Sequence, residues 1–490
     1  MLFNSFEFLI FFPVVTILFF LLPHKFRWLH LLVASCVFYM YLIPVYILIL
    51  LFTIIIDYIA GIVIENATGG KRKAFLVLSL VANIGILAFF KYYNFFAENI
   101  NALFHAAHST ASIDLLKIVL PIGLSFHTFQ AMSYTIEIYR GEQKAEKHFG
   151  IYALYVMFYP QLVAGPIERP QNILHQFHER KHFNYEEAKE GMKMILWGFF
   201  KKLVIADRLA VIVNNVYQEP AKFQGLPLAI AIVFFSFQLY CDFSGYSDIA
   251  LGTAKVMGYD LMNNFNRPFA SKSITELWRR WHISLSTWFN DYLFTPTITA
   301  LRDWGKTAIA FGILLTFFLC GFWHGAAWKF VIFGLLQGIA IVFEFYTRKK
   351  RKKLFGKLPD KINGWLSILL TFSYFACTCV FFRARDVKEA FYILSHLFTG
   401  WGQALSYSEL KGIISAIGGN DTFYGAFNLL LGVVILFIFE ALQRRVADNK
   451  VSAIVAGRAP AIRWGFYCLM VVLILTIGVY KEDTFIYFQF

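Results

Sequence analysis

The residue best placed to do acid–base chemistry is His324, which lies between two long apolar stretches. Ionisable side chains are costly inside a membrane, so each one found there is a candidate functional group. An imidazole has a reference pKa of about 6.5 and accepts a proton at neutral pH. Gly321 and Gly325 allow close backbone approach and a break in the helix. The pattern favours equally a general base facing a cavity and a core histidine hydrogen-bonded between helices.

A second histidine, His282, lies in a stretch rich in tryptophan. If this stretch is one helix, Trp278, Trp281 and His282 share a face, because residues three and four apart are neighbours. Glu276 and Arg280 then lie one turn apart and form an ion pair. The pattern predicts either an interfacial helix with a structural histidine or a second polar group of a reaction chamber.

Two carboxylates, Asp242 and Asp248, follow an apolar stretch and are interleaved with hydroxyl side chains. On an unbroken helix their separation corresponds to about 600° of rotation, so they face different directions and make a poor catalytic pair. Their residue types favour a helix end at which Asp and Ser bind nearby backbone groups.

The chain lacks the sequence motifs of several common catalytic and binding sites. It has no phosphate-binding Gly-rich loop, no nucleophile elbow and no HExxH zinc motif. None of its six cysteines forms a CxxC pair, so neither a metal site nor a disulfide framework is expected. Any group transfer must therefore draw its energy from an activated substrate.

The composition indicates a membrane protein. Hydrophobic types make up 58% of the 490 residues and charged types 16%, against about 25% charged residues in soluble domains. Such a chain is neither soluble and globular nor disordered. The net charge of +14 is concentrated in short runs such as 71–73 and 348–353, which fits positive-inside topology and membrane lipid as partner, and not nucleic acid.

The expected fold is an all-α polytopic membrane protein. A span needs about 20 apolar residues, and with the run 29–62 divided near Pro44 the chain offers roughly ten to thirteen transmembrane or re-entrant helices. The clear spans are 6–23, 44–62, 74–91, 190–213, 226–247, 307–322, 327–346, 363–382, 426–444 and 464–480. The weaker stretches, which are spans or re-entrant pieces, are 119–137 and 149–164.

We expect one membrane domain over 1–490, with N-terminal spans in 1–118, a core in 119–346 and C-terminal spans in 347–490. The stretch 260–306 is too polar to span, and its basic residues place it in the cytoplasm. The segment 383–425 then faces outward and is long enough for a small helix.

Six segments together resemble the membrane-bound O-acyltransferase family. They are PIGLSFHTFQ (121–130), GPIERPQNILHQF (165–177), YCDFSGYSDIALG (240–252), NFNRPF (264–269), LWRRWHISLSTWFNDYLF (277–294) and CGFWHGAAWKFVIFGLLQG (320–338). The ending FIYFQF (485–490) fits the family's alginate-type bacterial branch, to which the teichoic acid D-alanylation branch is related.

This resemblance implies a ring of helices around a central chamber, with His324 and His282 as the catalytic histidines. It implies transfer of an acetyl group from a cytoplasmic thioester, such as acetyl-CoA, for O-acetylation of a cell-surface or exported polysaccharide. The thioester is a co-substrate, and no cofactor is permanently bound. The expected location is the bacterial plasma membrane, and the expected partner is an extracytoplasmic SGNH-type acetyltransferase that completes the transfer onto sugar.

Seven further residues of the matching segments are candidates for substrate binding. They are Trp323, Trp281, Arg280, Asn266, Arg267, Asp242 and Tyr246. The guanidinium of Arg267, in a turn-like stretch, suits a carboxylate or phosphate.

Two other functions remain open. One is transfer of D-alanine, or another acyl group, from a carrier-protein thioester to a cell-wall polymer. The other is a transporter without chemistry, which would show paired broken helices in the two halves of the sequence; the chain shows no such duplication.

Overall fold

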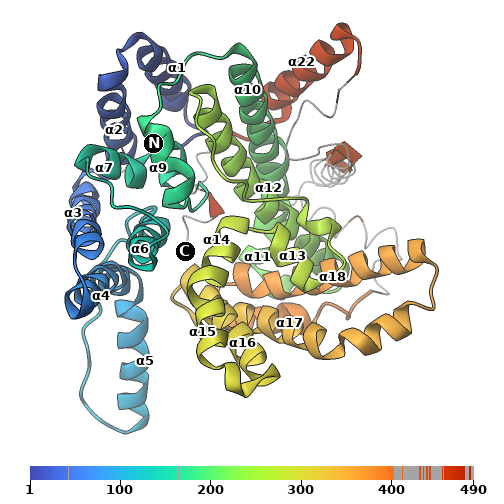
Figure 1. The fold of residues 1–490 in the computed structure, drawn as a ribbon. Helices are drawn as coiled ribbons and strands as arrows, with labels where there is room; N and C mark the ends of the chain where they lie inside the picture. The colour runs from blue at the N-terminus through green and yellow to red at the C-terminus, as the bar shows by residue number, and fades with distance from the viewer. Residues whose placement is uncertain are drawn as a thin grey trace. The chain divides into compact units, whose positions relative to one another are not determined.

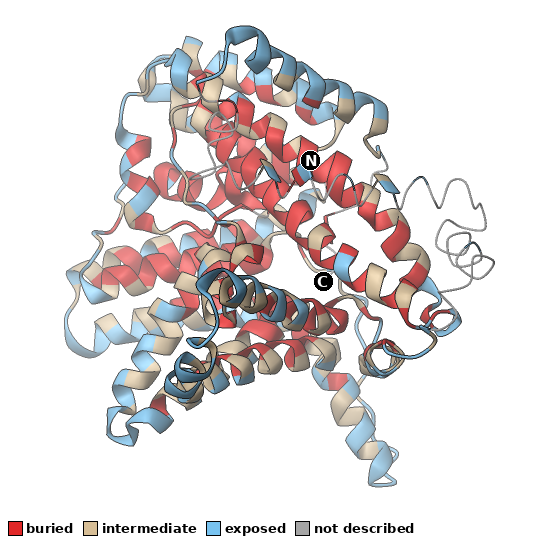
Figure 2. Cartoon of the chain, turned by 90° about the vertical axis from the view of Figure 1, so that its right-hand side faces the viewer, coloured by how far each residue is buried: buried red, intermediate tan, exposed pale blue. Residues whose placement is uncertain are grey.

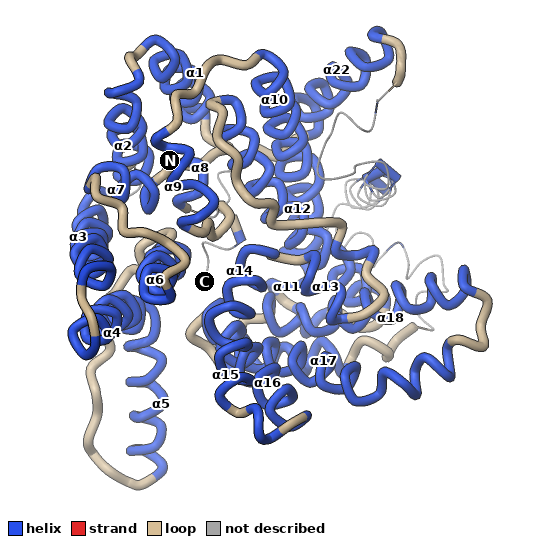
Figure 3. Tube along the Cα trace, viewed as in Figure 1, coloured by secondary structure: helices blue, strands red, loops and turns tan. Residues whose placement is uncertain are grey.

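The computed structural model describes residues 1–401 other than Leu42 and Ala164, then 411, 427, 430, 431, 434, 438, 439, 441, 442 and 455, and finally 457–480, 485 and 486. Within these residues every regular element is an α-, 3-10 or π-helix, as Figure 3 shows. The expected all-α fold is confirmed.

Seven helical segments of the described residues are long and apolar enough to cross a membrane, so the chain is a multi-pass membrane protein. They are Pro44–Asn66, Gly69–Ala106, Leu226–Val256, Lys306–His324, Trp328–Phe355, Asp360–Arg383 and Pro460–Ile477. Helix α1 (Phe6–Leu21) is apolar but shorter. Figure 2 shows helices whose residues are mostly buried and others with long exposed faces.

Three of the clear predicted spans are absent from this set. The stretch 6–23 forms only the shorter helix α1. The stretch 190–213 is not among the seven, because it carries Lys201, Lys202 and Asp207 and contains the π-helix η3 (Phe200–Ala206). Most of 426–444 lies outside the described residues.

The chain forms two compact units, the first made of 1–195 and 249–262. Its α-helices, all but α8 labelled in Figure 1, are α1, α2 (His24–Met40), α3 (Ile47–Asn66), α4 (Gly69–Leu87), α5 (Tyr93–Ala106), α6 (Leu124–Arg140), α7 (Phe149–Met157), α8 (Tyr159–Leu162), α9 (Pro170–His178) and most of α10 (Tyr185–Phe199). The π-helix η2 (Ala88–Tyr92) lies between α4 and α5, and the 3-10 turn η1 (Pro44–Tyr46) precedes α3. The predicted break near Pro44 is confirmed, since α2 ends at Met40.

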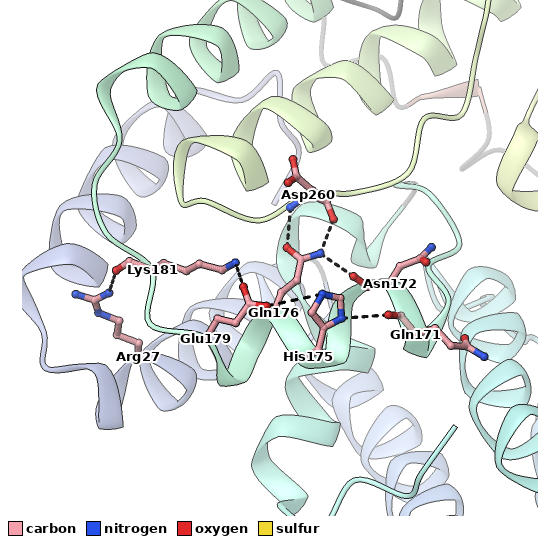
Figure 4. A network of polar contacts seen from close by, with 8 residues as sticks. All are labelled: Arg27, Gln171, Asn172, His175, Gln176, Glu179, Lys181 and Asp260. Carbon is pink, nitrogen blue, oxygen red and sulfur yellow. Dashed lines mark hydrogen bonds and ion pairs between the residues drawn. The ribbon is translucent and has the colours of Figure 1, made fainter. Parts of the chain in front are cut away.

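A polar network fixes α9 within the first unit (Figure 4). The Gln176 side chain donates to Asp260 O at 2.9 Å and accepts from Asp260 N at 2.9 Å, which ties α9 to the residues that follow α12. Arg27 donates to Lys181 O at 2.5 Å, which joins α2 to the chain after α9. Nearby, the buried Glu168 accepts from Met262 N, and burial raises the pKa of this carboxyl to about 7.

The second unit is made of 196–248 and 263–490. Its helices are α11 (Asp207–Gln218), most of α12 (Leu226–Val256), α13 (Ile274–Arg280), α14 (Ile283–Phe289), α15 (Thr295–Ala300), α16 (Lys306–His324), α17 (Trp328–Phe355), α18 (Asp360–Arg383), α19 (Val387–Ser395) and α22 (Pro460–Ile477), with π-helices η3 and η6 (Asn290–Phe294) and 3-10 turns η4 (Pro220–Lys222), η5 (Pro268–Ala270) and η7 (Arg302–Trp304). As expected, 260–306 holds only short helices, and a small helix, α19, follows Arg383. The single domain over 1–490 stays a prediction.

Helices α16 and α17 pack closely through glycine. A Cβ on Gly321 would lie 2.3 Å from Phe330 O, and one on Gly334 would lie 2.2 Å from Phe317 O. Within a membrane, helix association depends on such close van der Waals contact, because lipid gives no hydrophobic drive. The pair therefore fixes α16, whose last residue is His324, against α17.

We predict that Gly334→Ala destabilises the protein by about 1–3 kcal/mol, because the added methyl group must push the two helices apart. The matched control is Gly465→Ala on α22, where a Cβ meets no atom within 4 Å. Thermal unfolding of the detergent-solubilised variants measures both effects. Equal melting temperatures for the two variants would contradict this account of the packing.

Candidate functional site

His282 lies at a sharp turn and not within a helix. Helix α13 ends at Arg280, His282 has φ 43° and ψ 56°, and α14 begins at Ile283. The single helix on which a shared face of Trp278, Trp281 and His282 depended is therefore not formed. Left-handed backbone is uncommon for a residue with a side chain and must be held by its surroundings.

The preceding loop holds this turn. Asn266 N donates to Arg280 O at 2.9 Å, and Ile283 N donates to Asn264 O at 2.9 Å. The Ser284 hydroxyl donates to Asn264 Oδ1 at 2.6 Å. Asn264 is 1% exposed, and its positioning role was missed from sequence, although an Asn in a turn before proline is a recognisable signal.

His324 is the last residue of α16, and its imidazole faces aromatic rings. The ring centroids of Trp323 and Phe382 lie 5.0 and 5.3 Å from it. The next residue, Gly325, is extended, and a Cβ there would lie 2.2 Å from the Phe330 ring. The helix thus ends at the predicted glycine.

The structure brings the two predicted histidines together. Trp323 contacts both rings, with its centroid 6.2 Å from that of His282. His282 is 0% and His324 5% exposed. Burial lowers the pKa of His282 well below its usual value, and the nearby His324 lowers it further. A neutral imidazole in a site with little water can accept or donate a proton and bind an oxyanion.

The other tryptophan and arginine candidates lie around this turn. Trp281 is buried against Phe265 and Phe375, at centroid distances of 5.3 and 5.2 Å. Arg280 forms the predicted ion pair with Glu276 at 2.8 Å. Arg267, half-buried at φ 47°, begins the turn before η5, and Asn266 is exposed. Substrate binding by these residues stays a prediction.

The expected helix end at Asp242 and Asp248 is wrong, because α12 continues to Val256. Each carboxylate instead has its own buried lysine: Lys202 Nζ lies 2.7 Å from Asp242 Oδ1, and Lys201 Nζ lies 2.6 Å from Asp248 Oδ2. The two aspartates do face different partners, as their spacing predicted. Tyr246, between them, packs against Phe485, with the two centroids 4.4 Å apart.

A cavity of about 490 Å³ is lined by sequence neighbours of the histidines, although neither histidine lines it. Its lining includes Ile283, which follows His282, and Cys320, one turn before His324. Most of the wall is apolar, and the exposed Arg279 also lines it. Unlike Arg280, Arg279 makes no ion pair with the residues that the structure describes. Sequence reasoning missed Arg279 in favour of its neighbour, because only the packing shows which of the two faces the cavity.

Among the described residues no group of three or more His, Cys, Asp or Glu side chains could hold a metal ion. The six cysteines are free thiols. The arrangement of possible ligand side chains among these residues therefore does not support a bound metal ion.

Because the pKa of His282 is lowered on folding, the unfolded chain binds more protons than the folded one below about pH 6.5. Stability conferred by the neutral ring is thus present above this pH and lost as the pH falls. We predict that the melting temperature of the wild type falls more steeply between about pH 7.5 and 5.5 than that of His282→Asn, a residue that tolerates left-handed backbone. Parallel curves for the two proteins would contradict a buried, neutral His282.

Comparison with known proteins places this site in a family. The family model described as "MBOAT, membrane-bound O-acyltransferase family" matches residues 146–383. The probable alginate O-acetylase AlgI of Pseudomonas aeruginosa is 35% identical over 405 residues, covering 81% of this chain and 75% of that protein. The peptidoglycan O-acetyltransferase of Helicobacter pylori is 30% identical over 501 residues, covering 94% and 91%.

The teichoic acid D-alanyltransferase of Bacillus subtilis is 31% identical over 270 residues, which is 52% of this chain and 66% of that protein. The predicted kinship is thus confirmed over most of the chain, including the segments around both histidines. The chain is an O-acyltransferase and belongs to the membrane-bound O-acyltransferase family.

Proposed function

We propose that this protein moves an acetyl group from a cytoplasmic thioester across the membrane for O-acetylation of a cell-surface or exported polysaccharide. The observation that carries the proposal is the pair of buried imidazoles, His282 and His324, packed on Trp323 within a helical membrane protein. O-acetylation by relatives that match 81% and 94% of the chain supports the acetyl group and the polysaccharide acceptor.

In the proposed reaction a ring nitrogen of His324 takes the proton of the acceptor hydroxyl. The hydroxyl oxygen forms the new ester bond to the acetyl carbon, the carbon–sulfur bond breaks, and His324 returns the proton to the departing thiolate. An uncharged His282 donates a hydrogen bond to the oxyanion or orients the thioester. The acetyl group either passes directly from sulfur to the hydroxyl oxygen or passes through an acetylated His324; atoms are conserved on both routes.

In this proposal the donor occupies the cavity of about 490 Å³, whose lining includes the neighbour of His282, Ile283, and Cys320, one turn before His324. The apolar wall suits a thioester arm, and the guanidinium of Arg279 suits a phosphate or carboxylate on a donor such as acetyl-CoA. The basic stretch 260–306 supplies much of the lining, which supports a cytoplasmic position, where such donors are made.

Arg279→Gln is expected to raise the KM for the donor by about tenfold with little change in kcat, because it removes ground-state binding away from the reacting atoms. Arg280→Gln is the matched comparison, since that guanidinium pairs with Glu276. The measurement is thioester-dependent acetyl transfer by reconstituted protein. An equal rise in KM for both variants would contradict the role given to Arg279.

An extracytoplasmic SGNH-type acetyltransferase is the proposed partner that completes transfer onto the sugar, and the bacterial plasma membrane is the proposed location. Residues 383–395, which include α19, supply exposed polar side chains for such a contact on the outward side. Co-purification from membranes of a bacterium expressing both proteins tests the partnership.

His324→Ala is expected to reduce the acetyl ester content of the surface polysaccharide at least a hundredfold, because loss of general-base catalysis costs about 10²–10⁴ in rate. Phe322→Leu on the same helix turn is the control for expression and folding. Ester content is measured by mass spectrometry at matched membrane levels of each protein. Unchanged acetylation in a folded His324→Ala protein would overturn the catalytic assignment.

The same assay separates the alternatives. Loss of D-alanine esters in place of acetyl esters would indicate the D-alanyl branch, which a 31% identical relative represents. Loss of neither ester would indicate transfer of another acyl group.

A further inference from the structure

The π-helix η3 and the start of α11 hold the chain where it leaves α22. The Arg208 guanidinium donates to Ile477 O, the last residue of α22, and Val479 N donates to Leu203 O at 3.1 Å. π-Helical turns inside α-helices are frequent at functional sites. Here the π-helix presents backbone and side-chain groups to the residues that follow α22.

The next contact is made to a buried cluster of charge. Lys202 Nζ lies 2.7 Å from Asp242 Oδ1 and 2.9 Å from Asp207 Oδ1, and none of the three side chains is more than 8% exposed. Buried charges are costly unless they are paired and their remaining hydrogen-bonding capacity is met. The pairing satisfies only one oxygen of Asp242.

Residues 485 and 486 complete this cluster. Ile486 N donates to the second oxygen of Asp242 at 2.8 Å. The Phe485 ring centroid lies 4.5 Å from Lys202 Nζ and 4.4 Å from the Tyr246 ring centroid. Phe485 and Ile486 are 1% and 7% exposed. The backbone amide of Ile486 therefore binds Asp242 on α12, and the ring of Phe485 packs on Lys202 and on Tyr246 of α12.

The residue that follows Asp242 in sequence contacts His282. Phe243, which follows Asp242 on α12, packs edge-on against the His282 ring at a centroid distance of 4.7 Å. A change in how α12 is held at Asp242 is transmitted to this contact, because helix backbone is stiff over a single turn.

We propose that Lys202 and Asp242 are positioning residues that anchor the segment containing Phe485 and Ile486, and that the anchored segment fixes Phe243 of α12 against His282. Neither residue touches the reacting groups in this scheme. The proposal rests on the proposed function only where it predicts a rate; the anchoring is a statement about structure alone.

The chain supplies a matched control for the anchor. Lys201 and Asp248 form a second buried ion pair between the same two elements, at 2.6 Å, and Lys201 also donates to Ser244 at 3.0 Å. Asp248→Ala removes the whole carboxylate from this pair, as Asp242→Ala does from the other. Because only Asp242 accepts from Ile486 N, the difference between these two variants isolates that contact.

The first arm measures anchoring without any assay of activity. Ile486→Cys is labelled with a maleimide in detergent, and the labelled peptide is quantified by mass spectrometry, so the native cysteines do not interfere. We expect slow labelling at position 486 in the parent, acceleration of at least tenfold when Asp242→Ala or Phe485→Ala is added, and no acceleration with Asp248→Ala. Equal labelling rates with Asp242→Ala and Asp248→Ala would overturn the anchor, even if the protein is an acetyltransferase.

The second arm measures the effect on His282 in reconstituted protein. Phe485→Ala changes no charge and is expected to lower kcat for acetyl transfer about tenfold, leaving the donor KM within twofold and the melting temperature close to that of the parent. Asp242→Asn, which keeps an oxygen to accept from Ile486 N, should lose less activity than Asp242→Ala. Faster labelling with unchanged kcat would overturn the positioning role, whereas a parent protein without acetyl transfer but with the expected labelling pattern would overturn the proposed function alone.

Discussion

Lipid offers no hydrogen bonds, and this constraint decides how the polar residues of the chain are arranged. Lys201 and Lys202 lie on one helix and reach two aspartates of another, and Asp207 is a second partner of Lys202, so that these charges are paired out of contact with lipid. The Asp57 carboxylate likewise accepts from Ser79 at 2.6 Å and from Asn83 at 2.9 Å. The folded core is specified by such pairings as much as by apolar packing, because a helix that moved would leave a charge without its partner.

The same constraint gives the two histidines their chemical character. His324 ends a spanning helix, His282 lies at a turn held by hydrogen bonds, and both are buried against aromatic rings. Imidazole is the side chain that can remain neutral in such a place and still exchange a proton near neutral pH. Acyl transfer from a thioester profits from a site with little water, because water competes with the acceptor hydroxyl.

Much of the fold followed from the sequence, because spanning helices are set by length and apolarity alone. The helix break before Pro44 and the polar stretch 260–306 were predicted on that basis. His324 stood out as an ionisable group between apolar runs and His282 as the histidine of a tryptophan-rich stretch, and the resemblance singled out the same two. The left-handed turn at His282 was not predicted, since local spacing allowed a helix and only the bonds from Asn264 and Asn266 exclude it.

Pairings between distant segments were also beyond sequence reasoning. Asp242 and Asp248 looked like capping residues because their lysines precede them by some forty residues, at 201 and 202. Arg279 and Arg280 are indistinguishable by type, and only the packing of α13 separates the one that lines the cavity from the one paired with Glu276. These contacts depend on tertiary packing, which no local sequence pattern predicts.

The glycine contact between α16 and α17 bears on how the enzyme can move. With Gly321 and Gly334 in backbone contact, the two helices behave as one rigid body, and a rotation of either by a fraction of a turn would drive a neighbouring side chain into the other. His324, the last residue of α16, is therefore held in place by the backbone packing of its own helix. In the proposed reaction the base is then the fixed reference point, and the substrates must come to it.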